Sequence, residues 1–222
     1  MNSLKPQKQT VYCIPGLSAS KSIFEYLPHS DSVEYVLLDQ KFPLAGESFD
    51  SYIERWSKEI KIENAIVIGV SFGGIIAQEL VKHKAISKII LISSVRSPRD
   101  YSSIMKVFKY IRIYKLLLTR ILKKLYKIEQ NPKTEHQRKM SAMLKKYLPY
   151  RDPYYVKWSA EKIINWIPAE ISIPVLQIHG TKDEIFPFAK TKNAISIKDG
   201  THAVIVTKRK WFEENLLNYL ID

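Results

Sequence analysis

The segment 65–80, AIVIGVSFGGIIAQEL, constrains the fold of this chain more than any other stretch. Six apolar or small residues come first, a Gly-x-Ser-x-Gly pattern interrupts them at 69–73, and apolar residues then recur at helical spacing. A strand without a polar face must be covered on both sides, which is typical of a parallel sheet flanked by helices. We therefore expect residues 65–70 to form a central strand that turns sharply at Ser71 into a helix.

The same alternation of apolar runs and helical patterns continues along most of the chain. Further strand patterns lie at 10–16, 33–39, 86–94, 173–180 and 195–200, and helical patterns lie at 20–28, 48–61, 187–194 and 209–220. This order predicts the α/β class, with a mostly parallel sheet of about six strands and helices on both faces.

Residues 98–170, which we call the insert, interrupt that alternation. Helical patterns cover 101–128, 134–148 and 152–166, and the last begins with Asp152 as an N-cap and Pro153 in the first helical position. The sequence thus predicts an α/β core made of residues 1–97 and 171–222, with 98–170 as a helical insertion within one domain.

The insert also carries most of the positive charge. The chain has a formal net charge of +13, and residues 99–148 hold 14 Lys and Arg against 3 Asp and Glu. Apolar residues between the lysines indicate a lid whose apolar stripe covers a site while the lysines face solvent. The alternative is that this cationic face binds an anionic membrane surface or an acidic ligand. Nucleic acid is disfavoured, because no base-stacking or groove-docking motif accompanies the charge.

The strand-to-helix corner at Ser71 suits a nucleophile. A sharp turn there brings the strand and helix close together, so the positions two before and two after the serine must be small, as Gly69 and Gly73 are. The helix N-terminus would also stabilise an oxyanion beside Ser71, with the amide of Phe72 as one donor.

A serine nucleophile needs a base and a group that orients the base. Asp183 follows the predicted strand at 173–180, in HGTKDEIFP, and His202 follows the last strand, in KDGTHAVIV. Because the carboxyl ends of parallel strands meet at one sheet edge, we expect Ser71, Asp183 and His202 to converge there.

These motifs, in this order, resemble the α/β-hydrolase family, with GVSFGG as the nucleophile elbow, HGTKDEIFP as the acid loop and GTH as the histidine loop. The insert lies where that family carries a lid. The resemblance implies that Ser71 attacks an acyl carbonyl, His202 is the base and Asp183 orients it. It also implies an oxyanion hole formed by the amides of Phe72 and Leu17.

Two departures from the family pattern are visible. The loop at 14–20 reads IPGLSAS, with Pro15-Gly16 where the family commonly has His-Gly, so whatever support that histidine gives the loop is missing. The usual leading hairpin has no counterpart before residue 10, which is why we expect a trimmed sheet.

Other candidate residues receive simpler interpretations. His179 is a reserve base that we expect to be a packed core histidine, and Asp100 is an alternative acid. We expect His29, His83 and His136 to be solvated and Cys13 to be a buried thiol. The histidines share no metal-ligand spacing and no nucleotide-binding loop occurs, so no metal or cofactor is predicted. The polar first residues and the lack of a long apolar run predict a cytoplasmic protein.

The predicted activity is hydrolysis of an ester or thioester with an apolar acyl group. Acyl transfer, hydrolysis of a carbon–carbon bond, and a catalytically silent role in binding a lipid or other ligand remain as alternatives. Six aromatic residues cluster late in the insert; we expect most of them to pack within the lid and some to line an apolar acyl pocket, namely Tyr147, Tyr150, Tyr154, Tyr155, Trp158 and Trp166.

Overall fold

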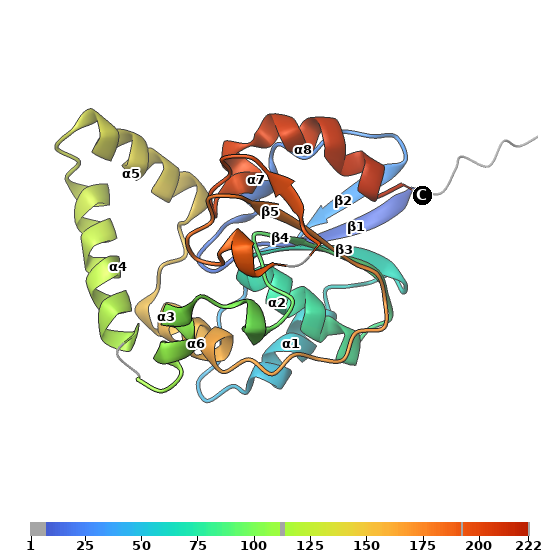
Figure 1. Cartoon of the computed structure of the whole chain (residues 1–222), viewed down its shortest axis with the longest axis horizontal. Helices are drawn as coiled ribbons and strands as arrows, with labels where there is room; N and C mark the ends of the chain where they lie inside the picture. Colours follow the sequence, from blue (N-terminus) through green and yellow to red (C-terminus); the bar gives the residue numbers. More distant parts are fainter. Residues whose placement is uncertain (1–7, 112–113, 192, 222) are drawn as a thin grey trace, which may run out of the picture.

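A single parallel sheet of six strands forms the centre of the computed structural model, which describes residues 8–111, 114–191 and 193–221 (Figure 1). The strands are β1 (Gln9–Ile14), β2 (Val33–Leu37), β3 (Ala65–Val70), β4 (Ile86–Ile92), β5 (Val175–Gly180) and β6 (Ile195–Ile197). Their order across the sheet is β2-β1-β3-β4-β5-β6, and every neighbouring pair is parallel. The prediction of an α/β fold with about six strands is confirmed.

Helices cover both faces of this sheet, as the apolar strands require. Helices α1 (Phe49–Ser57) and α2 (Phe72–Glu79) lie on one face, and α7 (Val204–Thr207) and α8 (Arg209–Asn215) lie on the other (Figure 1). The side chains of β3 alternate between the two cores: Val67 packs with α1 and α2, whereas Ile66 and Ile68 pack with α7 and α8. β3 is buried along its whole length, which fixes the position of the turn that follows it.

The described residues of the insert form four α-helices between β4 and β5. These are α3 (Ser103–Phe108), α4 (Tyr114–Gln130), α5 (Glu135–Tyr147) and α6 (Pro153–Ile164). Asp152 caps α6 as predicted, accepting a hydrogen bond from the Tyr155 amide at 2.8 Å. The α4–α5 pair projects away from the sheet, whereas α3 and α6 lie beside α1 and α2 (Figure 1).

Three helical patterns give shorter elements than predicted. The pattern at 101–128 is divided into α3 and α4, and the stretch around the break is rich in β-branched and aromatic residues, which are weak helix formers. The pattern at 20–28 gives only the 3-10 turn Lys21–Phe24 before Pro28, and the pattern at 209–220 ends its α-helical part at Asn215. A fourth pattern, at 187–194, likewise gives only the 3-10 turn Phe188–Lys190 among its described residues.

The end of the insert packs into the main core. Trp166 is buried and its Nε1–H donates to Oε1 of the buried Glu79 at 2.7 Å, while Tyr101 donates from its hydroxyl to the Ile163 carbonyl at 2.6 Å. Within the described part of the chain, no helix has both the length and the apolar character that crossing a membrane demands.

Candidate active site

Ser71 lies at a strained turn between β3 and α2. Its backbone angles are φ 52° and ψ −117°, an unusual conformation for any residue with a side chain. The close packing here depends on glycine: a methyl group added at Gly73 would lie 2.3 Å from the Ile14 carbonyl oxygen, and one added at Gly69 would lie 2.4 Å from the Gly73 oxygen. The two glycines therefore allow β1, β3 and α2 to meet directly beneath the serine.

The structure brings Ser71, His202 and Asp183 into one hydrogen-bonded chain. Ser71 Oγ lies 2.9 Å from His202 Nε2, and His202 Nδ1 lies 2.9 Å from Asp183 Oδ2. An ionised Asp183 can only accept, so His202 carries its proton on Nδ1 and leaves Nε2 to accept from the Ser71 hydroxyl. This arrangement can remove the proton from the serine as it attacks an electrophile.

The loops that carry Asp183 and His202 are bonded to each other. The Lys182 amide donates to the Gly200 carbonyl at 2.8 Å, and the Thr181 amide donates to the Ile197 carbonyl at 3.0 Å. A methyl group at Gly180 would lie 2.3 Å from the Gly200 oxygen, so the two loops touch through backbone atoms. The separation between the carboxylate and the imidazole is thus set by the backbone at the ends of β5 and β6.

Asp183 is buried but richly hydrogen-bonded. Burial alone would raise the pKa of Asp183, but hydrogen bonds from His179 and His202 and from the Phe186 amide outweigh it and hold that pKa well below its usual range. The Ile185 amide donates to the same carboxylate at 2.9 Å. Asp183 is therefore ionised at neutral pH and available to orient His202.

His179 contacts Asp183 and does not compete with His202 for the serine. It is fully buried, and its Nε2 lies 2.6 Å from the Phe186 carbonyl oxygen and 3.2 Å from Asp183 Oδ2. Since both neighbours accept hydrogen bonds, Nε2 carries a proton and donates. The prediction of a packed core histidine is correct, and its bond to the carboxylate is a role that the sequence alone did not indicate.

The loop after β1 lies against the serine. The Gly16 position is so close that a methyl group there would lie 3.2 Å from Ser71 Cβ. Leu17 follows it, and among the described turn and loop hydrogen bonds neither the Leu17 amide nor the Phe72 amide is a donor. Neither amide therefore has a backbone partner among those bonds, and the oxyanion hole that they would form stays a prediction.

The insert supports this loop, which sequence reasoning missed. The Ser20 amide donates to the Tyr147 carbonyl at 2.9 Å, Ser20 Oγ donates to the Lys146 carbonyl at 2.9 Å, and the Tyr150 amide donates to the Ser18 carbonyl at 3.2 Å. We call these three bonds the seam. They hold the loop where the resembling family commonly has a histidine, and they join residues more than 120 positions apart, which no local pattern reveals.

Comparison with solved structures identifies the architecture. An esterase from Exiguobacterium antarcticum aligns with a TM-score of 0.63 and 18% identity, covering 98% of this chain and 93% of the other. A bromoperoxidase from Bacillus anthracis gives 0.62 and 19% over 98% and 93%, and a carboxylesterase structure from Nitrososphaera gargenis gives 0.67 and 16% over 96% and 90%. This chain has the α/β-hydrolase fold. No family model matches the sequence, and a search of curated proteins gives no significant match.

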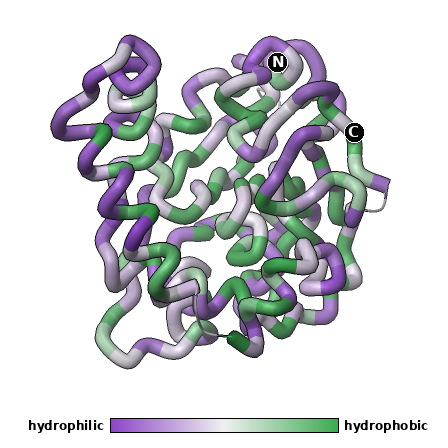
Figure 2. The backbone as a smooth tube through the Cα atoms, turned by 60° about the vertical axis from the view of Figure 1, so that its left-hand side comes forward, coloured by the Kyte–Doolittle hydropathy of each residue, from purple (hydrophilic) through white to green (hydrophobic). Residues whose placement is uncertain are grey.

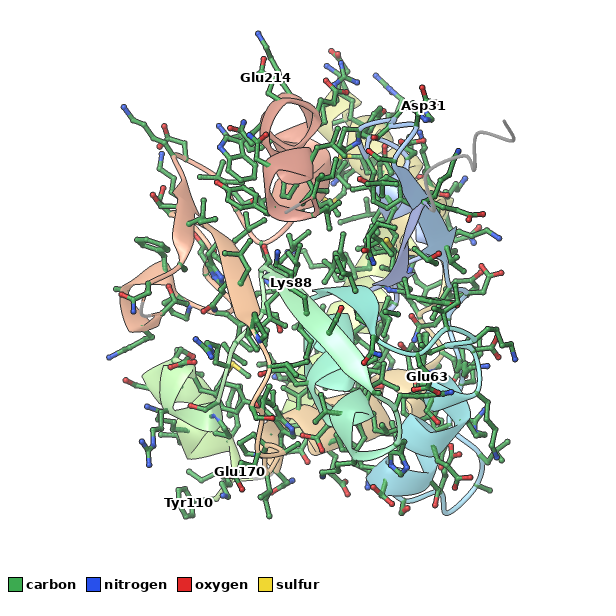
Figure 3. All side chains as sticks on the ribbon, turned by 90° about the vertical axis from the view of Figure 1, so that its right-hand side faces the viewer. Asp31, Glu63, Lys88, Tyr110, Glu170 and Glu214 are labelled. Carbon is green, nitrogen blue, oxygen red and sulfur yellow. The ribbon has the colours of Figure 1, made fainter. Side chains whose placement is uncertain are left out.

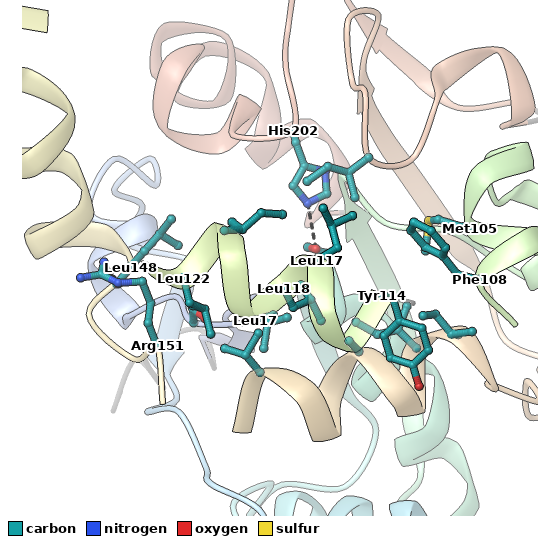
Figure 4. A pocket seen from close by; sticks show the side chains of 18 of the residues that line it. Leu17, Met105, Phe108, Tyr114, Leu117, Leu118, Leu122, Leu148, Arg151 and His202 are labelled. Atoms are coloured by element: carbon teal, nitrogen blue, oxygen red, sulfur yellow. Dashed lines mark hydrogen bonds between the residues drawn. The ribbon is translucent and has the colours of Figure 1, made fainter. Parts of the chain in front are cut away.

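Two cavities open onto Ser71. Cavity A has a volume of about 510 Å³ and lies between the serine and helices α3, α4 and α6, with Met105, Leu118, Ala160 and Phe186 in its wall (Figure 4). Cavity B has a volume of about 410 Å³ and lies between the serine and helices α5 and α7, with Met140, Leu144, Ile205 and Val206 in its wall. Both volumes fall within the range of roughly 300–1,000 Å³ that is usual for small-molecule sites.

The aromatic cluster contributes little to these cavities, in line with the expectation that most of it packs within the lid. Only Tyr147 of that set belongs to either wall, in cavity B. Tyr155 and Trp166 are buried in the packing between the insert and the core. The aromatic residues that do line cavity A are Phe108, Tyr114 and Phe186, none of which stood out by spacing.

The other acid, histidine and cysteine residues considered above do not contact Ser71 or His202 through a described hydrogen bond. Asp100 accepts hydrogen bonds from the Arg96 and Ser97 amides and caps the turn Pro98–Asp100, so it does not serve His202. His83 is half-buried and bonded to Asp50 at 3.1 Å, contrary to the solvated state that we predicted. His29 and His136 are exposed and Cys13 is buried, as predicted. Among the described residues, no group of three or more His, Cys, Asp or Glu side chains is arranged to hold a metal ion.

Proposed function

We propose that this chain is a serine hydrolase that cleaves a carboxylic ester or thioester with an apolar acyl group. The observation that carries the proposal is the continuous chain of hydrogen bonds from Ser71 through His202 to Asp183, with both links to His202 at 2.9 Å. This geometry is the one that activates a serine for acyl transfer. A cytosolic location stays a prediction.

In the proposed mechanism, Ser71 Oγ attacks the carbonyl carbon while His202 Nε2 accepts its proton. The negative charge on the carbonyl oxygen is stabilised by the Leu17 and Phe72 amides and by the N-terminus of α2. His202 then delivers the proton to the leaving oxygen or sulfur, which departs and leaves an acyl group on Ser71. Water, deprotonated by His202, releases the acid and restores the serine.

The walls around the serine favour an apolar acyl group over a sugar or a peptide. Cavities A and B are formed mostly by Leu, Ile, Val, Met and Phe side chains. Such walls stabilise bound methylene groups by about 0.8 kcal/mol each. They offer few hydrogen-bond partners to a polar acyl group.

The direct test is hydrolysis of p-nitrophenyl butyrate by the purified chain, by Ser71→Ala and by Ser87→Ala as a matched control. Ser87 is exposed on β4, outside both cavity walls. We expect turnover by the wild type and by Ser87→Ala, and a loss of at least about 10³-fold in Ser71→Ala. Equal turnover by Ser71→Ala would contradict the proposal.

The alternative activities separate in the same assay. Adding an alcohol acceptor and finding the transferred ester in place of the free acid would indicate an acyltransferase. Turnover of a β-diketone but of no ester would indicate a carbon–carbon bond hydrolase. Retention of an apolar ligand by a folded protein that turns over no substrate would indicate the silent binding role.

We also propose that α3 and the residues after it bind an anionic membrane surface. Ile104, Val107, Tyr110 and Ile111 are exposed large apolar side chains, with Tyr110 84% exposed. Tyr110 lies at the outer edge of the molecule (Figure 3), and the exposed Lys106 and Lys109 lie beside it in the sequence. Hydrophilic and hydrophobic segments alternate along the insert (Figure 2). Apolar groups that enter the interface, together with cations that meet anionic headgroups, are the features of an interfacial helix.

Flotation with vesicles tests this surface. We expect binding to phosphatidylglycerol vesicles at low salt, little binding to phosphatidylcholine vesicles, and loss of binding in the double variant Ile104→Ser/Val107→Ser. Ile62→Ser, which removes an exposed apolar residue from the core side of the molecule, is the control. If the wild type did not bind vesicles, or if Ile62→Ser lost binding as well, the proposed membrane surface would be contradicted. If the chain bound a soluble acidic ligand but no vesicles, the acidic ligand would be favoured over the membrane.

A further inference from the structure

Cavities A and B meet at the reacting atoms. Their walls share Leu17, Ser71, Leu148 and His202, while the rest of each wall comes from different helices. In cavity A, His202 and its bond to Ser71 lie above the α4 leucines (Figure 4). The nucleophile therefore lies between two separate apolar spaces of comparable size.

The carbonyl carbon of an ester bears three groups, and the site offers a place for each. The oxygen is taken by the Leu17 and Phe72 amides under the proposed function. The acyl chain and the leaving group extend from the same carbon in different directions. Because Leu17 and Leu148 stand in both walls, they divide the space on either side of Ser71.

We propose that the substrate is an ester with an extended apolar group on each side of its carbonyl, one in cavity A and the other in cavity B. This inference rests on the proposed serine hydrolase function and extends it to the leaving group. An ester of a short alcohol would leave one of the two cavities without an apolar occupant.

Two long polar side chains in the walls, Arg151 and Tyr147, already have hydrogen-bond partners within the chain, although the buried Nε of Arg151 has none. Arg151, in cavity A, is 5% exposed and its terminal nitrogens donate to Glu129 and to the Leu144 and Leu148 carbonyls. Tyr147, in cavity B, donates from its hydroxyl to Glu25 at 2.6 Å. The terminal nitrogens of Arg151 and the hydroxyl of Tyr147 are thus engaged within the chain, and burying a charged leaving group without a partner would be costly.

The mouths of the cavities are apolar as well. Leu117, Ile121 and Ile185 belong to cavity A and are each more than two-fifths exposed, and Met143 of cavity B is 45% exposed. An acyl chain or alcohol group that extends beyond the closed part of either cavity therefore contacts further apolar side chains.

A matrix of four esters tests the inference: ethyl acetate, hexyl acetate, ethyl hexanoate and hexyl hexanoate, with acid release followed by titration. We expect that lengthening either side raises kcat/KM at least about tenfold, since each buried methylene adds to binding, and that the two gains multiply in hexyl hexanoate. Fluorophosphonate labelling of Ser71 in the same preparation reports the proposed function independently of chain length.

Narrowing each cavity in turn shows which one holds the acyl chain and which one holds the alcohol group of the ester. Ala160→Phe on α6 narrows cavity A, and Val206→Phe on α7 narrows cavity B; Lys157→Phe and Thr207→Phe add the same ring outside both walls. We expect each cavity variant to remove the gain from one side of the ester only, and the two variants to affect opposite sides, while the controls retain both gains.

Two results would overturn the inference. If ethyl hexanoate and hexyl hexanoate had equal kcat/KM while Ser71 was labelled, the leaving group would have no apolar site. If both cavity variants lost the rise in kcat/KM on the same side of the ester, both cavities would bind the same group of the substrate. Absence of labelling in a folded protein would instead contradict the proposed function itself.

Discussion

The strand-end loops and the insert helices surround the same serine but are built in different ways. Around Ser71, backbone atoms touch through Gly69, Gly73 and Gly180, and β3, which leads into the serine, is fully buried. In the insert, by contrast, α3 has no buried residue and several apolar side chains of α4 are exposed. The comparison teaches that the positions of the reacting groups are fixed by backbone packing, whereas the shape of the cavities depends on side chains that pack less tightly.

Gly73→Ala disturbs the tightly packed turn at Ser71 and should have the largest effect on stability of the changes described here. The added methyl group would lie 2.3 Å from the Ile14 carbonyl oxygen, so the backbone must move. We expect the free energy of unfolding to fall by about 3 kcal/mol, the upper end of the usual cost of overpacking. Urea denaturation followed by circular dichroism measures it.

Gly46→Ala is the control for this change. Gly46 also demands a special conformation, with φ +71°, but an added methyl group there meets no atom within 4 Å. Only the strain of that conformation is added, which costs roughly 1 kcal/mol. Equal losses in the two variants would show that packing at the elbow is no tighter than in a surface turn.

The pH dependence of stability sharpens the account of Asp183. Its pKa is lower in the folded chain than in the unfolded chain, so its contribution to stability is complete above about pH 4 and is lost as the pH falls through the folded-state value. We expect the stability difference between the wild type and Asp183→Asn, on the order of 2 kcal/mol at pH 6, to shrink as the pH falls below 4. Urea titrations at pH 6 and pH 3 measure it. A difference that stays constant would mean that the carboxylate is not held ionised by its partners.

Ser20→Ala tests the place where the two regions meet and should have the smallest effect. It removes the bond from Ser20 Oγ to the Lys146 carbonyl but leaves the amide bond of the seam intact. A single neutral hydrogen bond is worth about 1 kcal/mol, so we expect kcat to fall roughly fivefold with KM little changed. Ser22→Ala, in the same turn, is the control. A rise in KM with kcat unchanged would indicate that the seam shapes a cavity and not the oxyanion hole.

The sequence was sufficient for the sheet and for the order of the three side chains at its edge. Apolar runs such as 65–70 are long enough to specify buried strands, and the positions of Ser71, Asp183 and His202 after strand patterns predicted their convergence. The fold follows from these local patterns. The meeting of the three side chains follows from the rule that the carboxyl ends of parallel strands lie at the same edge of a sheet.

What the sequence did not reveal depends on local details and on contacts that the spacing of apolar residues does not mark. The break between α3 and α4 falls in a pattern that still has helical spacing, and weak helix propensity decides there. His179 and Asp183 are only four positions apart, but their contact depends on how the loop after β5 turns, which no pattern specifies. The seam joins Ser20 to residues 146–147, and nothing near Ser20 in the sequence marks those partners. The two cavities likewise appear only when α4 and α5 are placed over the serine.

The central claim is that His202 and Asp183 activate Ser71, and labelling with a fluorophosphonate probe tests it most directly. The probe reacts with an activated serine whatever the natural substrate is, and peptide mass spectrometry identifies the labelled residue. We expect label on Ser71 in the wild type and strong loss of labelling in His202→Ala, with both proteins folded by circular dichroism. A folded wild type that takes no label, or labelling that persists unchanged in His202→Ala, would contradict the account.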